Sequence, residues 1–141
     1  MQRVTQIEYD SMEVRRGERI CKSADYSDVT RFDNYACYGY GSVFGDGAKL
    51  GRKSTFGIGC RFGNDVQIGE MSKVSFGARF GERARIGCGS KIGEKTVFGD
   101  GMKCENDCVF GNETDFGTGA RFGANVKTGR GCSCTDAKFE E

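Results

Sequence analysis

The stretch Phe44–Gly69, FGDGAKLGRKSTFGIGCRFGNDVQIG, places a large apolar residue followed by glycine at every sixth position. The apolar residues of this segment are Phe44, Leu50, Phe56, Phe62 and Ile68. A phosphate-binding glycine loop occurs once, between a strand and a helix. Because the spacing here returns again and again, the glycines indicate a repetitive scaffold and not a phosphate loop.

The six-residue register extends well beyond this segment. With Phe44 as position one, twenty consecutive units run from Ile20 to Cys134 without an insertion. Position two is glycine in fourteen of the sixteen units between Tyr38 and Thr128, and position five is small or medium-sized in nearly every unit. Position four favours Gly, Asp and Asn, which tolerate a left-handed backbone. The pattern predicts short strands with one large and one small inward residue, joined by tight turns.

Residues eighteen apart reveal a longer period. If three units form one coil, position-one residues eighteen apart stack on each other. One of the three resulting sets is aromatic throughout: Tyr26, Phe44, Phe62, Phe80, Phe98 and Phe116. The sequence therefore predicts a buried aromatic ladder along one side of a three-faced rod.

This pattern resembles the hexapeptide repeat of left-handed parallel β-helix proteins, and the resemblance covers Ile20 to about Phe139. It implies an all-β, single-domain left-handed parallel β-helix of about seven triangular coils, each made of three hexapeptides. We expect residues 1–19 to form an N-terminal cap with one or two strands (VTQIEY, then MEV) and residues 20–141 to form the β-helix. Such a cap is physically useful because an exposed coil end is a sheet edge that invites pairing.

The composition and the resemblance together bear on catalysis. Many hexapeptide-repeat proteins are acyltransferases, which generally rely on a histidine base and on a loop that leaves the coil. This chain has no histidine and its repeat is uninterrupted. Carbonic anhydrases built on the same coil need three histidine ligands for their metal. We therefore expect no enzyme activity, no catalytic residues, no cofactor and no metal site, although a hexapeptide-repeat acyltransferase stays an alternative.

We interpret most of the eight cysteines as small core residues and not as metal ligands. No CxxC pair suggests a zinc site. Five cysteines fall at positions that we expect to point inward as small apolar residues: Cys60, Cys104, Cys108, Cys132 and Cys134.

Position six lies mid-strand and is expected to face outward. In one of the three phases it forms what we call the basic face: Arg31, Lys49, Arg85, Lys103 and Arg121, with Gln67 interrupting the series. The overall net charge is only +1, so an electrostatic function depends on this local arrangement. Either the basic face binds an anionic partner, or its charged side chains simply keep the sheet surface soluble.

Two corners of the predicted coil also carry ordered side chains. The acidic corner consists of Asp28, Asp46, Glu82 and Asp100. It suggests pairing with a basic stripe of a neighbouring protomer, a row of divalent cations, or simply the turn preference of Asp and Asn. The apolar corner consists of Tyr40, Ile58 and Phe76. Outward apolar residues in a stack indicate a contact site, for a second copy or for another partner.

From these features we expect a non-enzymatic binding module or inhibitor. It would dock on a larger protein or nucleoprotein partner through the basic face and the apolar corner, as a small homo-oligomer (a dimer or trimer), with nucleic-acid contact as one option. By analogy, phage and mobile-element proteins that block host defences are often small rods. The alternative is a structural, self-assembling β-helix that forms part of a fibre or filament. The sequence has no membrane-spanning apolar run and no signal-peptide pattern, which favours a cytoplasmic protein.

Overall fold

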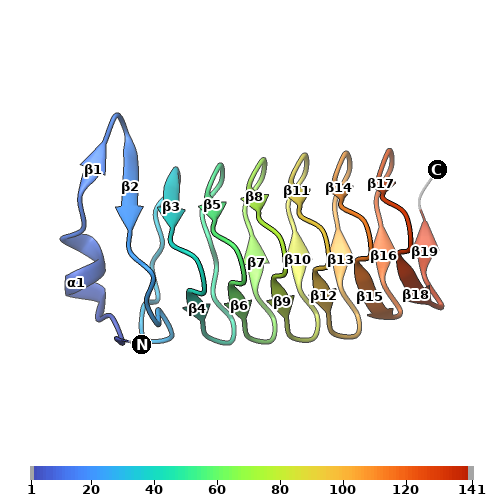
Figure 1. Ribbon diagram of the computed structural model, residues 1–141, viewed down its shortest axis with the longest axis horizontal. Coiled ribbons are helices and arrows are strands. Elements are labelled where there is room, and N and C mark those ends of the chain that lie inside the picture. Colours follow the sequence, from blue (N-terminus) through green and yellow to red (C-terminus); the bar gives the residue numbers. More distant parts are fainter. Residues whose placement is uncertain (1, 140–141) are drawn as a thin grey trace.

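The chain folds into a parallel β-helix of about seven turns, as the sequence predicted (Figure 1). The structure is a computed structural model that describes residues 2–139. In Figure 1 the coils follow one another along the long axis, from the helix α1 at one end to β19 at the other. From Thr55 onward each coil contributes one short strand to each of three sheets, so the rod has three faces and three corners.

The strands of each sheet are parallel apart from one terminal hairpin strand. The eight-stranded sheet contains, in order, β1 (Val14–Arg15), β2 (Glu18–Cys21), β3 (Ala36–Tyr38), β5 (Thr55–Phe56), β8 (Lys73–Val74), β11 (Lys91–Ile92), β14 (Val109–Phe110) and β17 (Lys127–Thr128). The six-stranded sheet contains β4 (Val43–Phe44), β6 (Arg61–Phe62), β9 (Arg79–Phe80), β12 (Val97–Phe98), β15 (Asp115–Thr118) and β18 (Ser133–Thr135). The five-stranded sheet contains β7 (Gln67–Ile68), β10 (Arg85–Ile86), β13 (Lys103–Cys104), β16 (Arg121–Phe122) and β19 (Lys138–Phe139).

The predicted aromatic ladder forms the spine of the core. All six of its members are at most 5% exposed. The rings of Phe44 and Phe62 stack with centroids 5.0 Å apart, and those of Phe62 and Phe80 lie 4.3 Å apart at an interplanar angle of 3°. This spacing approximates the strand separation of a sheet, because each ring is carried by a strand hydrogen-bonded to the next. Burial of these rings supplies much of the hydrophobic stabilisation of the rod.

Position five holds small residues because it shares the narrow interior with the rings. Where the residue is Ser or Thr, its hydroxyl is satisfied locally. Thr96 donates to the carbonyl oxygen of Gly93 at 3.0 Å, and Thr114 donates to that of Gly111 at 2.9 Å. These buried hydroxyl groups therefore do not leave unpaired polar atoms in the core.

The glycines of the repeat have two different physical roles. At position four the backbone is left-handed, as in Gly47 with φ +72°, and non-glycine residues such as Met71 adopt the same conformation. At position two the constraint is steric. A Cβ on Gly63 would lie 2.7 Å from the backbone nitrogen of Asp46 in the preceding coil. Position-two glycine thus allows the coils to stack closely at the corners.

This difference predicts unequal effects of alanine. Gly63→Ala should lower the free energy of unfolding by about 3 kcal/mol, because the coils must separate locally. Gly47→Ala should lower it by about 1 kcal/mol, because a Cβ there meets open space and adds only left-handed strain. Urea denaturation of the two variants measures the difference, and equal losses would contradict the steric explanation.

The first coil departs from the predicted register. Ile20 was expected to point inward but is 40% exposed, whereas Cys21 is buried. Cys21 pairs with Tyr38, only seventeen residues away, so the first unit is one residue short. The residue after Ile20 therefore takes position one.

The N-terminal cap contains a helix where a strand was expected in VTQIEY. Helix α1 spans Gln6–Asp10, and Thr5 and Glu8 form a capping box at its start. The β1–β2 hairpin follows, so MEV contributes only its last residue to a strand. The buried ring of Tyr9 covers the end of the coil, with its hydroxyl 2.9 Å from that of Tyr38.

Arg19 fastens the cap to the coil. Its guanidinium donates to the carbonyl oxygens of Tyr9, Asp10 and Met12 at 3.0–3.1 Å and forms an ion pair of 2.6 Å with Asp33. These carbonyls lie at the C-terminal end of the short helix, where a cation is favourable.

The last coil is also one residue short. Thr118 pairs with Thr135 and Phe122 with Phe139, each at a separation of seventeen, and the register shifts between Asp115 and Thr118. Cys134, expected to point inward, is exposed in this terminal coil, where no further described coil covers it. Of the other four predicted inward cysteines, Cys60, Cys104 and Cys108 are buried and Cys132 is partly buried.

These positions predict a graded reactivity of the thiols. Burial raises the pKa of Cys21 to about 12 and that of Cys60 to about 11, so both remain protonated and inaccessible at pH 8. Iodoacetamide should modify Cys134 at least about tenfold faster than Cys21 or Cys60 in the folded protein. Peptide mass spectrometry reports each rate, and modification in 6 M urea shows that all three sites are detectable.

Candidate docking surfaces

The basic face lies on the outer side of the five-stranded sheet. Strand pairing places Gln67, Arg85, Lys103 and Arg121 directly beside one another, and a bridge adds Lys49 next to Gln67. At one strand separation per coil, the series from Lys49 to the last strand is about 24 Å long. The predicted alignment of these four cations is therefore present in the structure.

The two ends of this face differ from the sequence prediction. Arg31 lies in no strand, and its guanidinium is 3.6 Å from the carboxylate of Asp10 in the cap. Lys138, which a strict repeat count places at an inward position, pairs with Arg121 and extends the series outward. The sequence contains an indication of this outward position, because the dipeptide Lys138–Phe139 repeats the pattern of Arg121–Phe122. We call the aligned cations Lys49, Arg85, Lys103, Arg121 and Lys138 the basic row.

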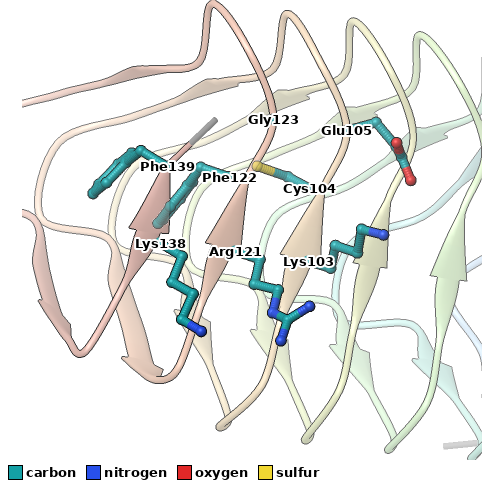
Figure 2. Close-up of a pocket in the computed structure, with 8 residues that line it drawn as sticks. All are labelled: Lys103, Cys104, Glu105, Arg121, Phe122, Gly123, Lys138 and Phe139. Atoms are coloured by element: carbon teal, nitrogen blue, oxygen red, sulfur yellow. The ribbon is translucent and has the colours of Figure 1, made fainter. Parts of the chain in front are cut away.

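The basic row has no anionic partner within the described residues. None of its five cations lies within 4.0 Å of a carboxylate of residues 2–139, whereas Arg83 pairs with Asp65 at 2.7 Å. Figure 2 shows Lys103, Arg121 and Lys138 following one another across three neighbouring strands. Like charges on adjacent strands repel each other, and no ion pair within residues 2–139 offsets this repulsion.

A pocket of about 300 Å³ lies at the C-terminal end of the basic row (Figure 2). It is lined by Lys103, Cys104, Glu105, Arg121, Phe122, Gly123, Lys138 and Phe139. The ring of Phe139 stacks on Phe122 at 4.8 Å and remains 65% exposed. The pocket is therefore lined by three cations, by the carboxylate of Glu105 and by an exposed aromatic ring.

The other faces carry weaker patterns of charge. Lys73 and Lys91 are aligned on the eight-stranded sheet, but Val109 follows them. On the six-stranded sheet, Arg61 and Arg79 are aligned and lie beside Val97. An uninterrupted run of three or more aligned cations is found, among the described residues, only in the basic row.

The acidic corner uses its short side chains to hold the coils together. The Oδ1 atom of Asp46 accepts from the backbone N–H of Asn64 at 2.8 Å, Asn64 accepts from Glu82 at 2.9 Å, and Asp100 accepts from Thr118 at 3.0 Å. Each bond joins a corner to the same corner one coil later. This arrangement gives the Asp and Asn residues a structural role between coils, which differs from the local turn preference that the sequence suggested.

Two of these carboxylates retain a free oxygen. The second oxygens of Asp46 and Asp100 make no hydrogen bond within residues 2–139, and Glu82 lies 3.0 Å from Arg83. Asp28, at the first coil, lies 3.8 Å from Arg3 of the cap. The corner therefore keeps its negative charge on the outside while it stabilises the coil.

The apolar corner is exposed as the sequence predicted. Tyr40 is 74% exposed, Ile58 59% and Phe76 44%. Gly41 donates to the carbonyl of Ile58, and Gly59 to that of Phe76, so the three residues lie on consecutive coils. Lys95 lies over the ring of Phe76 at 5.6 Å and marks the end of the patch.

The basic row and the apolar corner lie on opposite sides of the rod. Along the chain, each coil passes from the six-stranded sheet through the acidic corner to the five-stranded sheet, and later through the apolar corner back to the six-stranded sheet. In a three-sided section, the apolar corner is therefore the one opposite the five-stranded sheet. One flat contact cannot cover both surfaces.

Residues 2–139 contain no group of three or more Cys, Asp or Glu side chains placed to hold a metal ion. The described part of the chain also has no helix with the length and apolar character needed to cross a bilayer. Comparison with protein-family models, with curated proteins and with solved structures gave no match for this chain.

The ion pair between Arg83 and Asp65 predicts a measurable titration shift. Two hydrogen bonds, of 2.7 and 3.1 Å, lower the pKa of the Asp65 carboxyl below its ordinary value. Asp65 thus contributes stability at pH values above about 3.9, its value in an unfolded chain, and this contribution is lost as the pH falls through the lower folded pKa. An NMR titration should show the Asp65 pKa rising in Arg83→Gln, and an unchanged pKa would contradict the pairing.

Proposed function

We propose that this chain is a non-enzymatic binding module that docks on an anionic surface through its basic row. The observation that carries the proposal is the alignment of five cations with no carboxylate partner among the described residues. An approaching anionic surface would relieve their mutual repulsion and gain favourable contacts along the whole row. The partner would be a protein or nucleoprotein with an extended line of negative charge.

The rigidity of the rod suits docking of this kind. The row is carried by strands whose inward residues, such as Ile86 and Phe122, are fully buried, so the backbone beneath the cations is fixed. Binding then orders only the lysine and arginine side chains, which limits its entropic penalty. Solubility alone does not require the cations to be collected on one face.

The apolar corner would provide a second, independent contact. A stack of three exposed apolar residues on consecutive coils fits an apolar surface of another protein. Because this corner lies opposite the basic row, the module could engage two partners at once. A rod of this design would act as an adaptor or inhibitor placed between larger molecules, and would not require a catalytic group.

We also propose that the chain is a left-handed β-helix of the hexapeptide-repeat type. The six-residue period, the three strands per coil and the stacking of residues eighteen apart support this assignment. The lack of histidine argues against the acyltransferase chemistry associated with such proteins.

A self-assembling scaffold is the second candidate function. The observation that favours it is the presence of an acidic corner and a basic row on the same rod, with the same spacing between their members. A scaffold would use both rows between copies of the chain.

Charge reversal on two faces tests the docking surface. Arg85→Glu/Lys103→Glu should weaken retention on immobilised heparin, a polyanionic probe, by at least about tenfold in affinity at low salt. The matched control Arg61→Glu/Arg79→Glu changes the net charge equally but alters the six-stranded sheet. Elution salt concentration reports the difference, and circular dichroism confirms folding. If both variants elute at the same salt concentration, the basic row is not the docking surface.

A further inference from the structure

We infer that the anionic partner of the basic row is single-stranded nucleic acid, whose phosphates lie along the row and whose terminal base stacks on the exposed ring of Phe139. This inference rests on the proposed role of the basic row as a docking surface, and it names the class of the partner. It depends on how the row ends at the last described strand, β19.

The strand β19 joins a cation of the row to an exposed aromatic ring. In β7, β10, β13 and β16, the residue that follows the row position is buried, as Ile86 and Phe122 are. In β19 the residue that follows Lys138 is Phe139, which is 65% exposed. Because neighbouring residues of a strand point to opposite sides, Lys138 continues the row on the outer surface of the sheet, while Phe139 lies at the end of the core.

One face of the Phe139 ring is open for a further stacking contact. The other face stacks on Phe122, with ring centroids 4.8 Å apart and an interplanar angle of 10°. Figure 2 shows Phe139 beyond Phe122 at the end of this stack, with Lys138 on the same strand. Among residues 2–139, Phe122 is the only aromatic side chain that stacks on Phe139. A nucleobase on the open face would extend the stack by one more ring.

The charge next to this ring suits phosphate groups. Lys103, Arg121 and Lys138 line the pocket at the end of the row, together with the single carboxylate of Glu105. The lining therefore has a net positive charge, and the basic row extends from it to Lys49, over about 24 Å. A single strand that follows this line offsets the repulsion between the cations and releases the counterions condensed on its phosphates.

The ring distinguishes single-stranded nucleic acid from other anionic partners. The carboxylates of an acidic protein would pair with the cations but would gain no stacking from Phe139. A duplex keeps its bases stacked inside, whereas a single strand exposes the flat faces of its bases to aromatic side chains. Sites that bind single strands without sequence preference combine a positively charged track with an aromatic platform, and the end of this rod carries both.

The experiment measures filter binding of a radiolabelled thymidine octanucleotide to the full chain at low salt. Eight nucleotides fall within the range of about 4–16 that such sites occupy. Phe139→Leu should weaken binding about tenfold, because leucine keeps an apolar side chain over Phe122 but offers no ring for stacking. Phe139→Trp should bind at least as tightly as the wild type, because its indole ring restores the stacking.

Two controls separate stacking from charge. An octamer of abasic deoxyribose phosphates keeps the charge but has no bases, so it should bind the wild type about tenfold more weakly and be unaffected by Phe139→Leu. Phe76→Leu removes an exposed ring from the apolar corner, opposite the basic row, and should leave binding unchanged. Circular dichroism shows that each variant keeps the fold, and Phe139→Leu should elute from heparin at the same salt concentration as the wild type.

Several results would overturn the inference. It is wrong if the wild type binds the octamers with and without bases equally. It is also wrong if a duplex of the same length, or polyglutamate, binds as tightly as the single strand. Equal losses of heparin retention and of octanucleotide binding in Phe139→Leu would show that the ring only supports the last coil.

The outcomes also separate this inference from the proposed function. If Arg85→Glu/Lys103→Glu loses retention on heparin while Phe139→Leu leaves octanucleotide binding unchanged, the basic row is a docking surface but its partner is not a stacked single strand. If Arg85→Glu/Lys103→Glu and Arg61→Glu/Arg79→Glu elute from heparin at the same salt concentration, the proposed function fails and the inference fails with it.

Discussion

Hydrogen bonding between successive coils is the constraint on which this structure depends. Because each strand pairs with the strand one coil later, a residue of the regular coils has as its neighbour the residue at the same position of the next coil. This explains why aromatic rings stack with aromatic rings and why a Cβ at Gly63 would collide with the coil before it. The six-residue repeat of the sequence is therefore what allows like residues to stack on one another in successive coils.

The same pairing between coils places equivalent surface residues of successive coils in continuous rows along the rod. A cation at position six becomes part of a row when the next coil repeats it, so the basic row, the acidic corner and the apolar corner all arise from the period of the coil. Repetition also concentrates like charges, which repel at one strand separation. A row with no carboxylate partner among the described residues is a feature that folding alone does not favour, and it is the main support for the proposed contact with another molecule.

The prediction from sequence succeeded where the register is regular and failed at both ends. The core ladder from Tyr26 to Phe116 and the alignment of Lys49, Arg85, Lys103 and Arg121 follow from counting in sixes. The count misplaced Ile20, Cys134 and Lys138, because the first and last coils are each one residue short. The cap was misread because a single turn of helix, begun by Thr5 and Glu8, has too few residues to show a periodic pattern.

By itself the sequence determined the fold class, the inward and outward positions of most residues, and the absence of a histidine for catalysis. Only the tertiary structure decided how the surfaces relate to one another. It placed the apolar corner opposite the basic row, bound Arg31 to the cap, brought Lys138 into the row and left the row without a carboxylate among the described residues. The reason is that a period specifies which residues share a face, whereas ion pairs and shifts of register depend on distances between atoms that only the folded coil defines.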